Sequence, residues 1–159
     1  MAQATRWLSD DEQAAWRAFM LVTHLLDDAL DRQLQRDADM PHAYYGILAA
    51  LSEAPGATLR MSDLARMLRY SPSRLTHAVT RLEHRGWVTR RRCPTDRRGQ
   101  LAGLTAGGLR ALTTAAPGHV REVRARVFDR LSGDQVTQLR GICDTLLTGL
   151  DVTPGDRPW

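Results

Sequence analysis

The stretch Ser71–Gln100, SPSRLTHAVTRLEHRGWVTRRRCPTDRRGQ, decides the fold, because a helix with marked ends is followed at once by a strongly basic hairpin. Ser71 is a good N-cap, Pro72 suits the first helical position, and Gly86 suits the left-handed residue that closes a helix. The apolar residues between them recur at spacings of three and four and predict one buried stripe: Leu75, Ala78, Val79 and Leu82. The sequence therefore predicts a helix over residues 72–85.

The opposite face of this predicted helix is polar and carries Ser73, Arg74, His77, Arg81 and His84. Short hydroxyls, arginine and histidine can direct donors and acceptors into a DNA major groove, which is wide enough for a helix and shows a distinct pattern for each base pair. The alternative is that these residues form an ordinary solvated face. The helix taken alone does not separate the two interpretations.

The distribution of charge favours the nucleic-acid interpretation. All 22 basic residues are arginines. Residues 60–98 hold 11 of them against 3 acids, a net charge of +8, whereas the other 120 residues hold 11 arginines and 15 acids, a net charge of −4. The positive charge is therefore local, as expected of a surface that displaces counterions from a phosphate backbone.

The residues after Gly86 predict two short strands and a loop, over residues 88–104. Trp87–Thr89 is β-prone, Pro94–Asp96 is turn-like, and Gln100–Leu104 returns before Thr105 begins another helix. The hairpin carries five arginines, Arg90, Arg91, Arg92, Arg97 and Arg98. Arginine pairs with phosphate bidentately and enters narrow minor grooves. A helix followed by such a basic hairpin predicts a winged helix.

The chain resembles the MarR family of winged helix-turn-helix regulators over about 50 residues, with flanking helices that also fit. The matching blocks are Met61–Ala65 with Met67-Leu68, Ser71–Thr76, Arg81–Val88, Asp96–Arg98, and Leu104-Thr105 with Gly108. Two residues of the hairpin, Cys93 and Gly99, and the pair Pro117-Gly118 depart from the family pattern. Because proline costs roughly 3 kcal/mol in a helix interior, we predict a kink or break at Pro117.

The resemblance implies an obligate homodimer that binds a pseudo-palindromic operator, most often as a repressor. It places helix 72–85 in the major groove through Ser73, Arg74, His77 and Arg81. It places the wing 88–104 in the minor groove, with wing and backbone contacts from Ser71, Arg90, Arg92, Asp96, Arg97 and Arg98. The Asp96 carboxylate would orient the guanidinium of Arg98.

The rest of the chain predicts helices around the winged domain. A capping box at Ser9 and Glu12 starts a helix that runs to about Arg36, too long for one small domain to cover. We expect a mainly α protein with a small antiparallel β wing. Residues 1–40 and 106–151 form dimerisation helices, residues 41–105 the winged helix-turn-helix domain with Ser62 capping its first helix, and residues 152–159 a tail.

Length and composition limit the function classes. The 159 residues contain neither an apolar run long enough to span a membrane nor a charged-then-apolar leader, and the two cysteines lack metal-type spacing. We therefore expect a cytoplasmic protein, with no membrane partner, metal or cofactor. Cys143 lies in an apolar stripe and is expected in the core, without a redox role for it or for Cys93.

The sequence also bears on two further functions, catalysis and the binding of a small effector. An enzyme is disfavoured, because the five histidines are scattered and no nucleophile-elbow, P-loop or dinucleotide-binding pattern occurs. A small aromatic or phenolic effector is an open possibility, with a pocket formed by Trp16, Arg17, His24, Tyr44 and Tyr45. The alternative is that these side chains belong to the core and the solvated surface. The protein would then be a DNA-binding regulator, or an architectural protein, without an effector.

Overall fold

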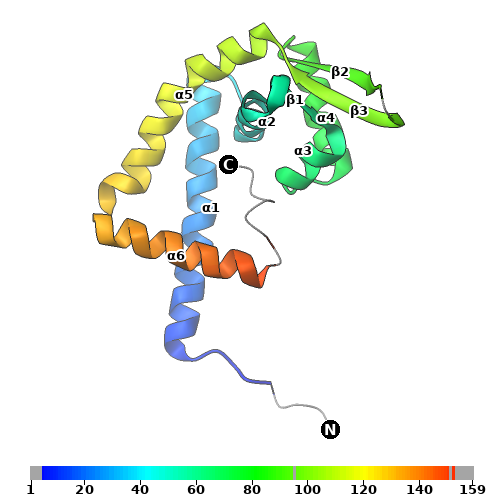
Figure 1. Cartoon of the computed structure of the whole chain (residues 1–159). Helices are drawn as coiled ribbons and strands as arrows, with labels where there is room; N and C mark the ends of the chain where they lie inside the picture. The colour runs from blue at the N-terminus through cyan, green and yellow to red at the C-terminus, as the bar shows by residue number, and fades with distance from the viewer. Residues whose placement is uncertain (1–4, 95, 151, 153–159) are drawn as a thin grey trace.

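The computed structural model describes residues 5–94, 96–150 and 152, without the side chains of Arg97 and Arg98. Six helices and a three-stranded sheet follow one another in the order α1 (Asp10–Ala38), α2 (His42–Glu53), β1 (Thr58–Arg60), α3 (Met61–Met67), α4 (Pro72–His84), β2 (Val88–Cys93), β3 (Asp96–Leu104), α5 (Ala106–Arg126) and α6 (Gly133–Gly149). Short 3-10 turns at Pro55–Ala57 and Phe128–Arg130 complete the set. The predicted fold class, mainly α with a small β wing, is confirmed (Figure 1).

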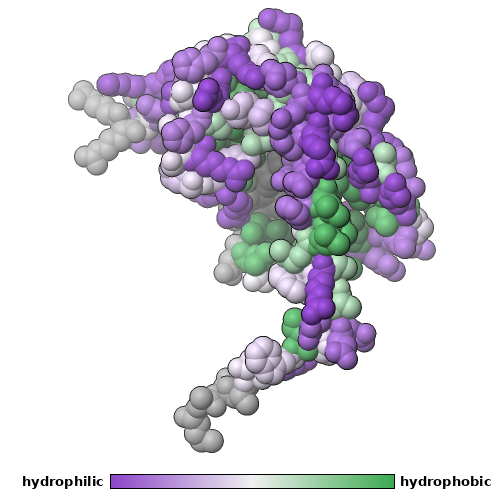
Figure 2. Space-filling model, turned by 180° about the vertical axis from the view of Figure 1, so that it is seen from behind, coloured by the Kyte–Doolittle hydropathy of each residue, from purple (hydrophilic) through white to green (hydrophobic). Residues whose placement is uncertain are grey.

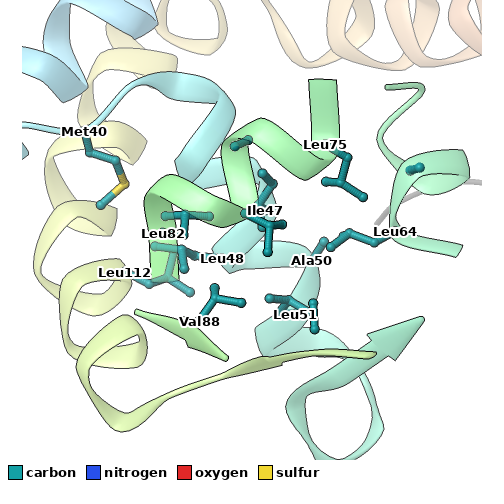
Figure 3. Close-up of a cluster of buried hydrophobic side chains, with 14 of the residues drawn as sticks. Met40, Ile47, Leu48, Ala50, Leu51, Leu64, Leu75, Leu82, Val88 and Leu112 are labelled. Carbon is teal, nitrogen blue, oxygen red and sulfur yellow. The ribbon is translucent and has the colours of Figure 1, made fainter. Parts of the chain in front are cut away.

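The core lies between α2, α4, the sheet and the start of α5. All four residues of the predicted stripe on α4 are buried, and they meet Ile47, Leu48 and Leu51 of α2 (Figure 3). Leu64 of α3 and Val88 of β2 close two sides of this cluster. The burial of one apolar stripe per helix is what fixes the rotation of α4 about its axis, and hence which face stays outside.

The sheet is antiparallel in the order β1-β3-β2, with Leu59 opposite Ala102 and Arg90 opposite Ala102 on the other side. Its register shifts between Arg92 and Cys93, so Cys93 lies opposite Asp96. A Cβ on Gly99 would lie 3.0 Å from an Asp96 carboxylate oxygen and 3.2 Å from the Cys93 Cβ. The two unexpected wing residues, Cys93 and Gly99, thus belong to one local packing arrangement.

Helices α1 and α5 run alongside each other and leave the winged domain together (Figure 1). A kink or break was expected at Pro117; the break is wrong, because α5 is continuous from Ala106 to Arg126, and the helix curves along its length. Gly118 has a role in this contact. A Cβ there would lie 3.0 Å from the amide nitrogen of Gln33, a residue of α1 that is only 2% exposed.

Two smaller predictions are corrected. Arg60, not Ser62, is the N-cap of α3, and it makes no side-chain capping bond, because β1 runs directly into the helix. Cys143 is exposed, since the face of α6 that carries it is not covered within the chain. The tail expected at residues 152–159 lies outside the described residues except for Val152. None of the described helices is both long and apolar enough to cross a bilayer.

Candidate nucleic-acid interface

The helix α4 divides cleanly into a buried face and an exposed face. Ser73, Arg74, His77 and Arg81 are all exposed, whereas Leu75, Ala78, Val79 and Leu82 are at most 8% exposed. The four residues predicted to read the major groove therefore lie together on the outer side of one helix. We call α4 the recognition helix from here on.

The N-terminus of the recognition helix is fixed by its cap. The Ser71 hydroxyl accepts a hydrogen bond from the backbone N–H of Arg74 at 3.2 Å. The Arg74 guanidinium lies 4.1 Å from the centre of the Tyr70 ring, a cation–π arrangement. Ser71 is thus engaged as a helix cap, and Arg74 is oriented by the residue that precedes the cap.

The wing is joined to the recognition helix through Arg90. Its backbone N–H donates to Glu83 at 2.9 Å, its Nε donates to the other Glu83 oxygen at 2.7 Å, and its terminal nitrogen donates to Thr80 at 3.2 Å. Both charged side chains are about three-quarters buried. Arg90, predicted as a DNA contact, is therefore committed to positioning the wing.

The remaining predicted wing residues surround the tip of the hairpin. Arg92 is exposed, and Asp96 accepts a hydrogen bond from Arg60 of β1 at 3.4 Å. The side chains of Arg97 and Arg98 lie outside the described set, so the expected pairing of Asp96 with Arg98 stays a prediction. Asp96 thus joins the wing tip to the neighbouring strand.

Apolar side chains remain exposed on the helices outside the winged domain. They lie on the N-terminal half of α1, late in α5, in the 3-10 turn that follows α5 and on α6, and include Trp16, Phe19, Leu21, Val22, Val120, Phe128, Ile142 and Leu146. Figure 2 shows apolar surface gathered around the long helices, whereas the winged domain is mostly hydrophilic. Monomeric proteins rarely expose such an extended apolar surface, so these helices have the character of an interface.

A cavity of about 950 Å³ lies between the winged domain and α6. Asp27 and Asp31 of α1, His42 of α2, Tyr70 and Arg74 contribute to its wall, together with the side of α6 that carries Arg140, Cys143 and Leu147. Asp31 accepts the His42 backbone N–H at 2.8 Å, and Asp27 bonds the His42 ring at 2.9 Å. Burial raises the pKa of the Tyr70 phenol, which therefore stays neutral.

The five residues predicted as an effector pocket do not line this cavity. Trp16, Arg17 and His24 are exposed on α1, where Arg17 bonds Gln13 and His24 faces Asp28. Tyr44 and Tyr45 are half-buried against the core. Within the described residues, no three His, Cys, Asp or Glu side chains converge as metal ligands.

Sequence reasoning missed the residues that position the site. The sequence gives no sign that Glu83 bonds Arg90, because that contact depends on how β2 leaves the recognition helix. Tyr70 was not singled out, although an aromatic residue next to a helix cap, four positions before an arginine, was a usable signal. Gly108 belongs to the family pattern, and the structure shows the reason for glycine, since a Cβ there would lie 2.1 Å from the Trp87 carbonyl oxygen.

Comparison with known proteins agrees with this arrangement. The MarR family model matches residues 38–99, from the end of α1 to the wing. The chain is similar to Sco3205, a MarR family transcriptional regulator from Streptomyces coelicolor solved in complex with DNA. The TM-score is 0.90, with 49% identity over 99% of each chain.

Two further proteins extend the comparison. AbsC, a MarR family transcriptional regulator from the same organism, has a TM-score of 0.87 and 41% identity over 92% of this chain and 99% of its own. The transcriptional regulator HosA of Escherichia coli O111:H- is 28% identical over 119 residues, 75% of this chain and 86% of HosA. The exposed polar face of α4, the arginine-rich wing and these similarities, which reach 49% identity over 99% of the chain, lead to one conclusion: the chain belongs to the MarR family of winged-helix transcriptional regulators.

Proposed function

We propose that this protein binds duplex DNA sequence-specifically as a homodimer, with the recognition helix in the major groove and the β2–β3 wing in the adjacent minor groove. The observation that carries the proposal is the exposed polar face of α4, set in the segment that concentrates the positive charge of the chain. The crystal structure of the 49% identical Sco3205 in complex with DNA supports DNA binding by this chain.

The exposed side chains of α4 suit base recognition. Arginine donates two hydrogen bonds to guanine, and serine and histidine can each donate to or accept from a base edge. Arg74, His77 and Arg81 lie at spacings of three and four, so they follow one line along the helix. We assign base contacts to these three residues and to Ser73.

The wing and the N-terminus of the recognition helix would contact the phosphate backbone. We assign phosphate and minor-groove contacts to Arg92, Arg97 and Arg98, and the helix N-terminus at Ser71 adds backbone N–H groups that favour an anion. Because Arg90 bonds Glu83, we assign it a positioning role in place of a direct contact. Such a surface predicts affinity that falls steeply as salt is raised.

A second copy of the chain is the partner that the exposed apolar helices fit. A single recognition helix covers few base pairs, whereas a two-fold pair about one helical turn apart adds the binding energy of two half-sites. We therefore assign residues 1–40 and 106–151 to dimerisation and residues 41–105 to DNA binding. A dimer on a pseudo-palindromic operator in the cytoplasm would act as a repressor by blocking access of the polymerase.

The cavity beside Arg74 suits a small aromatic acid. Neither Arg69 nor Arg74 forms an ion pair with a carboxylate of the described residues, and both line the cavity with the Tyr70 ring. A carboxylate would meet the guanidinium groups, and an aromatic ring would pack against Tyr70, Leu147 and the rest of the apolar wall. Binding there would act on the recognition helix and release the DNA.

Selection of bound fragments from a random DNA pool tests the DNA proposal. We expect an inverted repeat whose half-sites lie about 10 base pairs apart. Recovery of no common sequence would overturn specific recognition. Affinity that does not change with salt would overturn the phosphate contacts.

The dimer is tested by light scattering of the wild type and of Ile142→Glu, which places a charge on the exposed apolar face of α6. We expect a wild-type dimer and a folded, weaker-associating variant. A wild-type monomer at micromolar concentration would overturn the homodimer.

A panel of aromatic carboxylates tests the effector. We expect release from the operator and a higher melting temperature, both reduced in Tyr70→Ala, with Arg17→Ala as a control outside the cavity. A panel without effect would favour the alternative, a DNA-binding regulator or architectural protein that has no small-molecule effector. Regulators rather than enzymes among the relatives argue against a catalytic role.

A further inference from the structure

Arg85, the residue that ends the recognition helix, is bonded to the end of α1. One terminal nitrogen of its guanidinium donates to the backbone carbonyl of Asp39 at 2.5 Å, and the other donates to the Asp39 carboxylate at 3.1 Å. The guanidinium also lies 5.0 Å from the centre of the Trp87 ring. A single side chain therefore ties the end of α4 to the end of α1 and to the residue before the wing.

The acceptor of this tie is held rigidly. Asp39 closes α1 in the left-handed conformation, with φ of 46°, and its N–H donates to the carbonyls of Leu34 and Gln35. The next residue, Met40, is completely buried, and its N–H donates to Leu34 at 3.3 Å. The Asp39 carbonyl is thus fixed in direction by a helix cap and by the core.

The two hydrogen bonds of Arg85 contribute unequally to holding the helix ends together. The Asp39 side chain is 95% exposed, so its ion pair with Arg85 is screened by water and contributes little. The bond to the carbonyl joins a charged donor, on a side chain that is 34% exposed, to a neutral acceptor of fixed position. The backbone contact therefore holds the two helix ends together.

This tie reaches a helix that packs against α4 much less than it packs against α2 and α5. The helix α1 packs chiefly against α2 and α5, and α4 packs against α2, α3 and β2. The angle between α1 and α4 therefore depends on the packing of both helices against α2 and the shared core, and on the direct bond from Arg85. If α1 pairs with its counterpart across a two-fold axis, a change in this angle displaces both recognition helices symmetrically.

We propose that Arg85 is a positioning residue that sets the separation of the two recognition helices, and hence the half-site spacing that the dimer accepts. The inference rests on the homodimer proposed above. One inserted base pair moves a half-site by about 3.4 Å along the duplex and rotates it by about 35°. A dimer whose α1 and α4 are held at a fixed angle should bind the altered spacer weakly. A dimer in which this angle can change should bind it almost as well.

The test measures affinity by fluorescence anisotropy on the selected operator and on versions with one base pair added to or removed from the spacer. Arg85→Lys keeps the positive charge but lacks the fork that bonds Asp39 twice. We expect wild type to prefer its own spacer by roughly tenfold or more, the factor of one charge-assisted hydrogen bond, and Arg85→Lys to narrow this preference to about twofold.

Two variants separate positioning from other roles. Asp39→Asn keeps the carbonyl and tolerates the left-handed conformation, and Arg110→Lys changes an arginine that lines the same hollow beside Trp87. Both should retain the wild-type spacer preference. If Arg85 only contacts phosphate, Arg85→Lys should also retain it, and Arg85→Ala should weaken binding equally on every spacer.

A spin-label distance measurement gives a readout without DNA. Labels on Arg32→Cys of α1 and His77→Cys of α4, in a Cys93→Ala, Cys143→Ser background diluted with unlabelled protein, report the α1–α4 separation. We expect a broader distance distribution in Arg85→Lys than in wild type. Wild-type spacer preference and an unchanged distribution in Arg85→Lys would overturn this inference alone, whereas a wild-type protein without spacer preference would overturn the dimeric docking as well.

Discussion

The carboxylate of Glu83 and the guanidinium of Arg90 join the last turn of the recognition helix to the first strand of the wing. Glu83 accepts both the backbone N–H and the side-chain Nε of Arg90, and Thr80 accepts a third hydrogen bond. These hydrogen bonds join the recognition helix and the wing into one unit. Their relative position is set by a pair of charged side chains that are about three-quarters buried.

Replacing Glu83 by Gln should loosen this unit. The amide nitrogen of Gln cannot accept a hydrogen bond, so a largely buried guanidinium loses one acceptor, and we expect the free energy of unfolding to fall by about 1–3 kcal/mol. The variant loses one negative charge, so charge alone predicts tighter DNA binding, whereas loss of positioning predicts weaker operator binding. Denaturant unfolding measures the change in stability, and fluorescence anisotropy measures the change in operator affinity.

The matched control is Asp129→Asn, which removes the partner of Arg124 in an ion pair whose two side chains are both at least half exposed. It should change stability by less than about 1 kcal/mol. Operator binding by Glu83→Gln that is as tight as wild type or tighter would contradict the positioning role.

Gly108 should not tolerate a side chain. A Cβ would lie 2.1 Å from the Trp87 carbonyl oxygen, which also accepts the backbone N–H of Thr105 at 3.0 Å, so neither backbone segment can move freely. We expect Gly108→Ala to destabilise the protein by about 3 kcal/mol or more. Gly141→Ala on α6 meets nothing within 4 Å and should stabilise it by about 0.5–1 kcal/mol. Equal melting temperatures for the two variants would contradict this packing.

His119 makes stability depend on pH. Burial, and then the charge of His42, lower the pKa of the His119 imidazole, whose Nδ1 is buried without a hydrogen-bond partner among the described residues. Because the unfolded chain binds this proton more tightly, stability is highest above about pH 6.5 and falls as the pH drops through the unfolded pKa towards the folded one.

The variant His119→Phe tests this dependence. It keeps a ring against Tyr45, 4.3 Å away between centroids, and removes the titration. We expect the fall in unfolding free energy between pH 7.5 and 5 to be smaller in His119→Phe than in wild type, and unchanged in His24→Gln, which alters an exposed histidine. The same pH slope in all three proteins would refute the assignment to His119.

His77 should contribute to base preference rather than to general affinity. It is exposed in the middle of the recognition helix, and a base contact of this kind is typically worth about 1–3 kcal/mol. We expect His77→Ala to weaken operator binding and to relax selection at one position in each half-site. Arg124→Ala, which removes a charge from α5, should leave the selected sequence unchanged. An identical selected sequence for His77→Ala and wild type would argue against α4 as the reading element.

Several features could be predicted from the sequence because they depend on neighbours along the chain. The helix Pro72–His84 follows from the cap at Ser71, the proline after it and the stripe of Leu75 to Leu82, all of which act within a few residues. The capping box at Ser9 started α1 as expected, and Thr105 capped α5 by accepting the Gly108 N–H. The exposed polar face of α4 followed directly, because burying one stripe leaves the opposite face outside.

Other features were decided by contacts between segments far apart in the chain. The sequence suggested a break at Pro117, but packing along α1, with Gly118 against Gln33, stabilises one continuous helix. Cys143 belongs to an apolar stripe, yet it is exposed, because the chain does not cover its own α6. Hydrophobic spacing predicts that a face is apolar, but only the tertiary arrangement decides what covers it.

The polar residues likewise have some properties that the sequence determines and others that tertiary contacts decide. The sequence determined where arginine is concentrated, since charge can be counted along a chain. Only the folded structure decided what each guanidinium does: Arg90 holds Glu83, Arg85 holds the end of α1, and Arg74 lies on Tyr70. A guanidinium at the end of a long side chain takes the partner that the fold brings within reach, and that partner is up to 46 residues away in the sequence.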